Sequence, residues 1–262
     1  VARVLEEINI LLDNGYKEII ISGIHLGCYG KDLKDGTNLA KLIEKFDRFA
    51  SYDFRFRLSS IEVHEIDEEL LSVLKRNKNF CHHFHLPLQS GSDRILRLMN
   101  RRYTKEEFLT KIIQLKENFN NPAFSTDVIV GFPSEEEQDF EQTIDICRRT
   151  GFFKIHIFPY SDRLITRSST MPFKCAPHTI KQRCQKLLAV EKENMQRCYT
   201  QYLNMKCRIL VEKFIEKERA YFGYTDKYLK TLVYSNNGNL HNKFIDIIPT
   251  VLKEGYLIAE HR

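Results

Sequence analysis

HLPLQSGSDRILRLMNRRYT, residues 85–104, changes character abruptly at its fifth residue. The apolar run 82–88, HHFHLPL, is typical of a short buried strand. It ends in the small and polar residues 89–92, and a helix-like pattern begins directly after Ser92, a residue type that caps helix N-termini. This stretch therefore predicts a strand, a polar loop and a helix in succession.

The same unit recurs on both sides of this stretch. Helix-like patterns cover 1–14, 38–50, 65–77, 134–151 and two stretches after Ser92 and Thr104. Strands separated by helix-length patterns predict an α/β fold with a parallel sheet and helical crossovers, either an open doubly wound sheet or a barrel. The strand-like runs are 16–23, 54–60, 82–88, 124–132 and 153–160.

The last quarter of the chain has a different sequence pattern. A linking helix is expected over 177–202, and short strand patterns with turn signals follow it from about residue 205. Five or so short strands in this length predict a small antiparallel barrel of the oligonucleotide-binding kind. We therefore divide the chain into residues 1–202 and 203–262.

Composition sets broad limits. The 262 residues are 42% hydrophobic and 29% charged, which is typical of a globular protein. No apolar run approaches the roughly 20 residues that cross a membrane, so we expect a cytoplasmic protein without a membrane partner. The formal net charge of +5 does not by itself indicate a nucleic-acid binder. The seven cysteines are odd in number and widely spaced, which argues against a disulfide scaffold or a zinc ribbon.

The carboxyl ends of the five strands carry polar, charged or small residues. In parallel α/β folds ligands bind at this edge, because loops there vary without disturbing the core. Five coincident strand ends predict a ligand site without naming its ligand. The segments concerned are 22–25, 59–62, 89–92, 131–133 and 160–163.

Several segments resemble one enzyme family over essentially the whole chain. Residues 85–104, STDVIVGFPSEEEQDFEQT (125–143) and HIFPYSDR (156–163) resemble the core of the radical S-adenosylmethionine (SAM) methylthiotransferases. GIHLGCYGKDL (23–33) is similar to the subgroup acting on threonylcarbamoyladenosine of tRNA, whereas the subgroup acting on isopentenyladenosine usually has glutamine and asparagine after this first glycine. FGYTDKYLKTLVY (222–234) resembles their small RNA-binding TRAM barrel.

The resemblance implies a partial barrel of six parallel strands and a radical reaction at C2 of the adenosine at tRNA position 37. The first strand ends in a CxxxCxxC loop that holds a four-iron four-sulfur cluster, which cleaves SAM, and a second cluster supplies the methylated sulfur. Partners would be SAM and the tRNA anticodon stem-loop, with a monomeric enzyme. The alternatives are the isopentenyladenosine reaction and a non-catalytic RNA-binding remnant.

The chain departs from this family at its start. Its seven cysteines contain no CxxxCxxC, and it opens on a helix pattern at Val1. We therefore expect five of the six strands here, with the first strand, the cluster loop and the N-terminal domain upstream of Val1. On this interpretation neither cluster has ligands in this chain, and the fragment alone is inactive.

The resemblance also assigns roles to individual residues. Gly23 would let the backbone approach the methionyl amine, Gln89 and Ser90 would face the ribose and carboxylate, and Val130 and Gly131 would flank the adenine. No metal ligand or catalytic residue is expected in this chain. His83 and His85 share a strand face, but without a clustered third ligand we interpret them as structural or site-lining.

Substrate contacts are expected from both parts of the chain. Glu62 and Arg163 would face the cavity, where Arg163 could pair with the carboxylate of SAM or with that of the carbamoyl-threonine group, since arginine binds carboxylates. In the tail, Tyr224 and Lys227 belong to a cluster of rings and cations suited to unstacked bases.

Four positions differ from the family pattern. The family has proline at Val63, glycine at Ser134, and a glycine-threonine pair followed by a small residue where this chain has Ile165-Thr166 and Ser168. Loss of glycine predicts an altered local loop rather than an altered fold.

Overall fold

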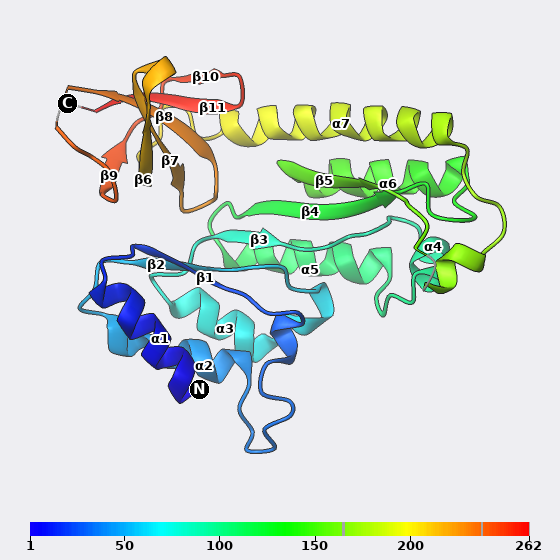
Figure 1. Ribbon diagram of the computed structural model, residues 1–262, viewed down its shortest axis with the longest axis horizontal. Coiled ribbons are helices and arrows are strands. Elements are labelled where there is room, and N and C mark those ends of the chain that lie inside the picture. The colour runs from blue at the N-terminus through cyan, green and yellow to red at the C-terminus, as the bar shows by residue number, and fades with distance from the viewer. Residues whose placement is uncertain (164–165, 237, 262) are drawn as a thin grey trace.

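Two parallel sheets and the helices that cover them form the larger part of the molecule (Figure 1). The computed structural model describes residues 1–163, 166–236 and 238–261. Strands β1 (Glu18–Ile21) and β2 (Arg55–Leu58) pair in parallel, as do β3 (His83–His85), β4 (Ala123–Val130) and β5 (Lys154–Pro159). Single parallel bridges, Phe56 to Phe80 and Ser60 to His85, connect the two sheets. The five strands predicted from the sequence and their parallel α/β arrangement are confirmed.

Helices connect these strands and cover one face of them. Capping side chains begin several helices as their sequences predict: Ser92 accepts from the backbone N–H of Ile95, and Thr104 forms a capping box with Glu107. Gly151 ends the helix before β5 in the left-handed conformation. The helices are α1 (Ala2–Asp13), α2 (Leu39–Glu44), α3 (Glu68–Arg76), α4 (Asp93–Leu98), α5 (Lys105–Asn118), α6 (Glu137–Thr150) and α7 (Pro177–Thr200), with short 3-10 turns η1 (Leu26–Cys28), η2 (Lys45–Phe49), η3 (Val63–Glu65), η4 (Arg167–Thr170) and η5 (Glu216–Glu218).

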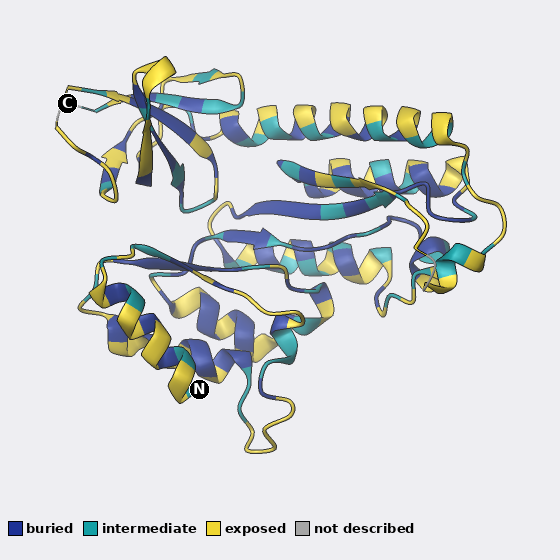
Figure 2. Ribbon diagram, viewed as in Figure 1, coloured by how far each residue is buried: buried dark blue, intermediate teal, exposed yellow. Residues whose placement is uncertain are grey.

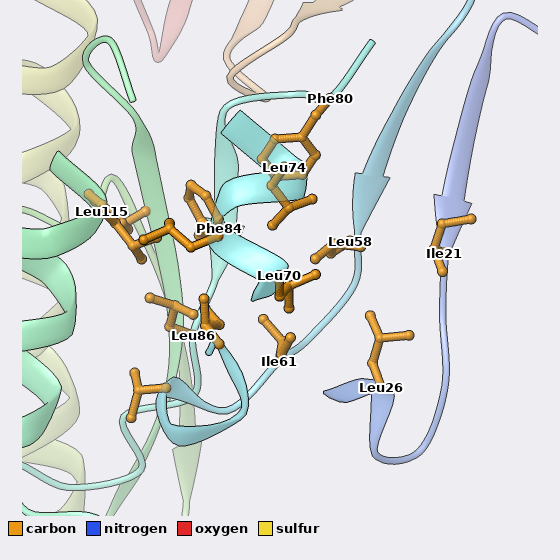
Figure 3. Close-up of a cluster of buried hydrophobic side chains, with 14 of the residues drawn as sticks. Ile21, Leu26, Leu58, Ile61, Leu70, Leu74, Phe80, Phe84, Leu86 and Leu115 are labelled. Atoms are coloured by element: carbon orange, nitrogen blue, oxygen red, sulfur yellow. The ribbon is translucent and has the colours of Figure 1, made fainter. Parts of the chain in front are cut away.

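The main core lies between the strands and these helices. Phe84 on β3 packs against Phe119 at the end of α5, with ring centroids 5.1 Å apart, and Leu58, Leu74 and Leu86 lie in the same cluster (Figure 3). In Figure 2 strands β2 and β3 and most of β4 are dark with burial, whereas β5 and the outer faces of α1 and α7 are largely exposed or intermediate. Side chains alternate across a strand, so the β3 residues on either side of Phe84 project from the opposite face.

A curled sheet of six strands follows α7. Its order is β10 (Val251–Lys253), β11 (Tyr256–His261), β8 (Lys230–Ser235), β7 (Ala220–Thr225), β6 (Cys207–Ile215) and β9 (Phe244–Ile247). All neighbours are antiparallel except β11 and β8, which are parallel. The small antiparallel-rich β unit expected in the tail is confirmed, and residues 243–252 contribute two of its strands, β9 and β10. Pro249 lies between them and has no N–H to continue a ladder.

The proposed boundary near residue 203 falls between α7 and β6 and stays a prediction. No helix in the described ranges is both long and apolar enough to cross a membrane.

Candidate functional site

The loop after β3 continues as an extension of the sheet before it turns. The backbone N–H of Gln89 donates to the carbonyl of Asp127 at 2.8 Å, and the N–H of Ile129 donates to the carbonyl of Gln89 at 2.9 Å. Gln89 has φ 58°, a left-handed conformation that is unusual outside glycine, asparagine and aspartate. This strained turn redirects the chain at the carboxyl end of the sheet.

Ser90, Gly91 and Ser92 then pack against α6. Ser90 is 0% exposed, and its hydroxyl lies 3.2 Å from the backbone N of Ser92, which donates to it. The Ser92 hydroxyl donates to Asp139 on α6 at 2.6 Å. The small residues of this loop therefore fasten α4 to α6, and the predicted contact of Ser90 with a cofactor stays a prediction.

The end of β4 is also tightly packed. Gly131 has φ 78°, and its N–H donates to Glu135 at 2.8 Å. A Cβ on Gly131 would lie 2.4 Å from Cγ1 of Ile180, so both conformation and packing require glycine here. Val130 beside it is 0% exposed. Glu135 pairs with Arg183 at 2.7 Å; burial nevertheless raises the pKa of Glu135, outweighing the Gly131 and Arg183 contacts.

Unlike Gly131, Gly23 has room for a side chain. It follows β1, and a Cβ built on it meets nothing closer than Cα of Leu26 at 3.7 Å, which is ordinary van der Waals contact. Neither a positive φ nor packing explains glycine at this position. An unexplained glycine at a strand end favours close approach of a ligand.

A cavity of about 760 Å³ opens at this edge of the sheet. It lies between the chain that follows α4, the end of β4 and η4, and its arginines can receive anionic groups. None of the nine predicted site residues lines it directly, although Ile129 and Phe132 flank Val130 and Gly131. The lining residues include Arg97, Arg101, Ile129, Phe132, Arg167 and Ser168.

Glu62 reaches this cavity through Arg101. Its carboxylate accepts from Nη1 of Arg101 at 2.7 Å, and it also forms a capping box with Glu65 around η3. Val63 is the first residue of η3, a position at which helices tolerate proline, so the family's proline and this valine fit the same turn. The sequence did not indicate Arg101 as a site residue. Its place in the cavity becomes apparent only when the structure brings Glu62, in the loop after β2, beside the chain that follows α4.

The remaining predicted positions lie nearby or outside the described residues. Arg163 is exposed after β5. Ser134 has φ 68°, which explains why the family prefers glycine there, and its N–H donates to the carbonyl of Phe173 at 2.8 Å. Ser168 shares a hydrogen bond of 3.0 Å with Thr166. Ile165 falls outside the described ranges.

Tyr224 and Lys227 lie at the opposite edge of the sheet. Figure 1 shows the tail at the left and α4, with the loops that follow β4 and β5, at the right. Tyr224 stacks on Tyr228 with ring centroids 4.5 Å apart, and Nζ of Lys227 lies 5.1 Å from the ring centroid of Tyr202. Burial raises the pKa of Tyr224 to about 12. Both side chains therefore make contacts within the protein, and their contact with RNA stays a prediction.

A cluster that the sequence argument missed lies on the face of β3, β4 and β5 opposite Phe84. We found no third ligand near His83 and His85 in the sequence, but the structure brings Asp127 and His156 to His85. Nε2 of His85 lies 3.3 Å from Oδ2 of Asp127. One signal for this cluster was present in the sequence, because Asp127 is the single charged residue of the strand run 124–132.

Comparisons with known proteins agree on a family. Residues 1–147 match the family model described as the radical SAM superfamily. The chain is 36% identical over 257 residues to threonylcarbamoyladenosine tRNA methylthiotransferase MtaB of Bacillus subtilis, covering 97% of this chain and 56% of that protein. It is 37% identical over 223 residues to tRNA-2-methylthio-N(6)-dimethylallyladenosine synthase of Caldicellulosiruptor saccharolyticus, covering 85% and 47%. The chain thus spans about half the length of these relatives.

A solved structure shows the same fold. Coproporphyrinogen III oxidase (HemN) from Escherichia coli, described as a radical SAM enzyme, superposes with a TM-score of 0.53 over 68% of this chain and 40% of that one. The two sequences are 16% identical, so this likeness concerns the fold alone.

Proposed function

Because the chain belongs to the radical SAM superfamily, we propose that it is part of a methylthiotransferase acting on C2 of N6-threonylcarbamoyladenosine at position 37 of tRNA. Its curated relatives are tRNA methylthiotransferases for two different adenosines, so overall identity favours the reaction class but does not separate the substrates. The observation that carries the choice is the segment GIHLGCYGKDL after β1, which resembles the threonylcarbamoyladenosine subgroup.

Membership of the superfamily implies SAM and an iron–sulfur cluster as cofactors. The cavity at the strand ends fits SAM in chemistry, because Arg97, Arg101 and Arg167 offer donors to its carboxylate. The cysteines do not fit a cluster: within the described residues, no three cysteine sulfurs gather, and Cys81 and Cys147 are buried in the core. We therefore assign to this chain the binding of SAM and of the substrate. We assign to it no reaction step at an iron–sulfur cluster.

We assign the residues at the carboxyl edge to the two ligands. Gly23, Gln89, Ser90, Val130 and Gly131 would shape a part of the SAM site outside the lining of this cavity, with Gly23 the position where the backbone itself approaches the ligand. Of these, Gly23 has the strongest support, since packing accounts for Gly131 and for Ser90.

Two charged residues, Glu62 and Arg163, would serve substrate binding, Glu62 through Arg101 and Arg163 directly. Glu62 would hold Arg101 at the cavity by their 2.7 Å ion pair, and exposed Arg163 would bind the carboxylate of the carbamoyl-threonine group. The tail, including Tyr224 and Lys227, would support binding of the anticodon stem-loop.

The substrate assignment is tested in cells that lack the full-length gene. Mass spectrometry of tRNA nucleosides should then show loss of 2-methylthio-N6-threonylcarbamoyladenosine and accumulation of its unthiolated precursor. The dimethylallyladenosine derivative serves as the internal control and should be unchanged. Loss of that second nucleoside instead would assign the enzyme to the other subgroup, and loss of neither would refute the reaction class.

Gly23 allows a test that separates binding from folding. We expect Gly23→Ala in the full-length protein to change unfolding free energy by less than about 0.5 kcal/mol, because the new methyl group meets only ordinary contacts. SAM affinity should nevertheless fall roughly tenfold, equivalent to about 1.4 kcal/mol. Gly238→Ala, where the added Cβ meets nothing within 4 Å, is the matched control in both urea unfolding and SAM titration. Equal SAM affinity in the two variants would remove Gly23 from the site.

A further inference from the structure

Three adjacent strands place a histidine, an aspartate and a second histidine together on one sheet face. His85 lies on β3, Asp127 on β4 and His156 on β5, and one ligand atom from each lies within 4.8 Å of the other two. Asp127 and His156 are direct cross-strand neighbours in the parallel register. We propose that these three side chains bind one divalent transition-metal ion, independently of the iron–sulfur chemistry of the superfamily and of the proposed reaction.

The donor set suits such an ion. Two imidazoles and a carboxylate are ligands that Zn²⁺ and Fe²⁺ use in proteins, with open positions left for water or another ligand. Two ligands about 2.1 Å from a tetrahedral ion lie ~3.4 Å apart. Nε2 of His85 and Oδ2 of Asp127 are 3.3 Å apart, so this pair already has the required separation.

Behind His85, a serine and another histidine supply a second layer of contacts. Ser125 Oγ lies 2.9 Å from Nδ1 of His85 and 2.8 Å from Nε2 of His83. Metal-ligating histidines typically donate their other ring N–H to a fixed acceptor, which sets the tautomer and the ring orientation. Ser125 occupies that position for His85.

The hydrogen bonds that join His83, Ser125 and His85 can form both with and without a bound ion, but their directions differ. Without one, His85 donates from Nε2 to Asp127, accepts the Ser125 hydroxyl at Nδ1, and Ser125 accepts from His83. An ion on Nε2 of His85 reverses both bonds: Nδ1 of His85 donates to Ser125, whose hydroxyl donates to His83. In either state Nδ1 of His83, a residue 5% exposed, has no hydrogen-bond partner among the described groups. An unpaired buried nitrogen beside a row of hydrogen bonds calls for an explanation. A row of hydrogen bonds that reverses its direction when an ion binds supplies one.

A cavity gives the ion access. His156 is exposed, and together with Ser125 it lines a cavity of about 410 Å³ between β4, β5, α7 and the tail. Tyr224, Tyr228 and Tyr256 form its far side. A proposed metal site needs such a path from solvent as well as its ligands.

Metal titration of this 262-residue chain tests the site. The protein is stripped with a chelator and titrated with Co²⁺, whose visible d–d absorption reports coordination, and then with Zn²⁺ as competitor. We expect one equivalent of Co²⁺, displaced by one equivalent of Zn²⁺. Asp127→Asn and His156→Gln should each weaken Zn²⁺ binding at least 100-fold, and Ser125→Ala, which removes the orienting hydroxyl, roughly 10-fold.

Matched variants exclude other ligands and misfolding. His241→Gln, an exposed histidine in the tail, and Cys28→Ser, a partly buried cysteine after β1, should retain the affinity of the unchanged chain. His156 is exposed, so His156→Gln should keep the unfolding midpoint in urea, and a lost Co²⁺ spectrum in a folded variant then reports ligation. The proposal would be overturned if the unchanged chain bound no stoichiometric metal, or if Asp127→Asn and His156→Gln bound it as tightly as the unchanged chain. Loss of binding in Cys28→Ser would overturn it too.

Discussion

Replacing Glu18 with glutamine is expected to lower the free energy of unfolding by about 3–5 kcal/mol, because it leaves two buried arginines without their shared counter-charge. Glu18 begins β1 and accepts from Nε of Arg57 at 2.7 Å, from Nη2 of Arg57 at 3.0 Å, and from Arg55. The side chains of Arg57 and Arg55 are 3% and 9% exposed, so water cannot replace the lost carboxylate.

The same arginines connect the sheet to the tail. Arg57 donates to the carbonyls of Asp226 at 2.9 Å and Thr225 at 3.2 Å, and Arg55 donates to the carbonyl of Tyr224 at 3.0 Å. Glu18 therefore orients two guanidinium groups that reach the turn between β7 and β8. Its loss should weaken the junction between β2 and residues 224–226 of the tail, as well as the pairing of β1 with β2.

Urea unfolding followed by far-UV circular dichroism measures this effect, since the chain has no tryptophan to report it. Asp53→Asn is the matched control, because Asp53 pairs with Arg208 of β6 at 2.7 Å across the same junction, but both side chains are more than half exposed, at 56% and 52%. We expect Asp53→Asn to cost no more than about 1 kcal/mol. Equal costs for the two substitutions would contradict the role given to Glu18.

The effect should also depend on pH with a defined sign. Burial raises the pKa of Glu18, but hydrogen bonds and charge attraction from Arg57 and Arg55 outweigh it, and the net pKa lies below the ordinary value of 4.5. The stability contributed by the ionised carboxylate is fully present above pH 4.5 and is lost as pH falls through the lowered folded-state pKa. The difference between the unchanged chain and Glu18→Gln should therefore be constant near neutral pH and shrink only below pH 4.5.

The order of strands and helices could be predicted from sequence because it depends on local patterns. Apolar runs such as 124–132 and the helix signals at Ser92 and Gly151 each act within a few residues. The common edge at which the strands end could also be predicted, since parallel strands deliver their carboxyl ends to one edge, and the binding of a ligand there stays a prediction.

What could not be predicted depends on register and docking. His85, Asp127 and His156 become neighbours only when β3, β4 and β5 pair in one particular alignment, and a shift of one residue would turn them to the opposite face. Tyr224 and Lys227 have the composition of an RNA-binding surface, but in the structure Tyr224 stacks on Tyr228 and Lys227 lies over the ring of Tyr202. Composition alone could not predict these contacts within the protein, and the contact of both side chains with RNA stays a prediction.

Gly91 is the second position with a large expected effect, although its backbone is not in the left-handed region. A Cβ there would lie 2.5 Å from Cα of Thr143 and 2.7 Å from the carbonyl oxygen of Gln142, both backbone atoms of α6. Backbone cannot rotate aside as a side chain can, so the whole loop must separate from the helix. Gly91→Ala should therefore cost about 3 kcal/mol of unfolding free energy.

A double substitution decides whether backbone contact is the cause. Thr143→Ala removes the Thr143 hydroxyl that accepts from the Gly91 N–H at 2.9 Å, but leaves the clashing backbone atoms in place. Gly91→Ala with Thr143→Ala should therefore unfold at no higher urea concentration than Gly91→Ala alone. Gly238→Ala, whose added Cβ meets nothing within 4 Å, should change stability by less than about 1 kcal/mol. Rescue by Thr143→Ala would mean that a side chain, rather than the close approach of α6, makes glycine necessary in the QSGS loop.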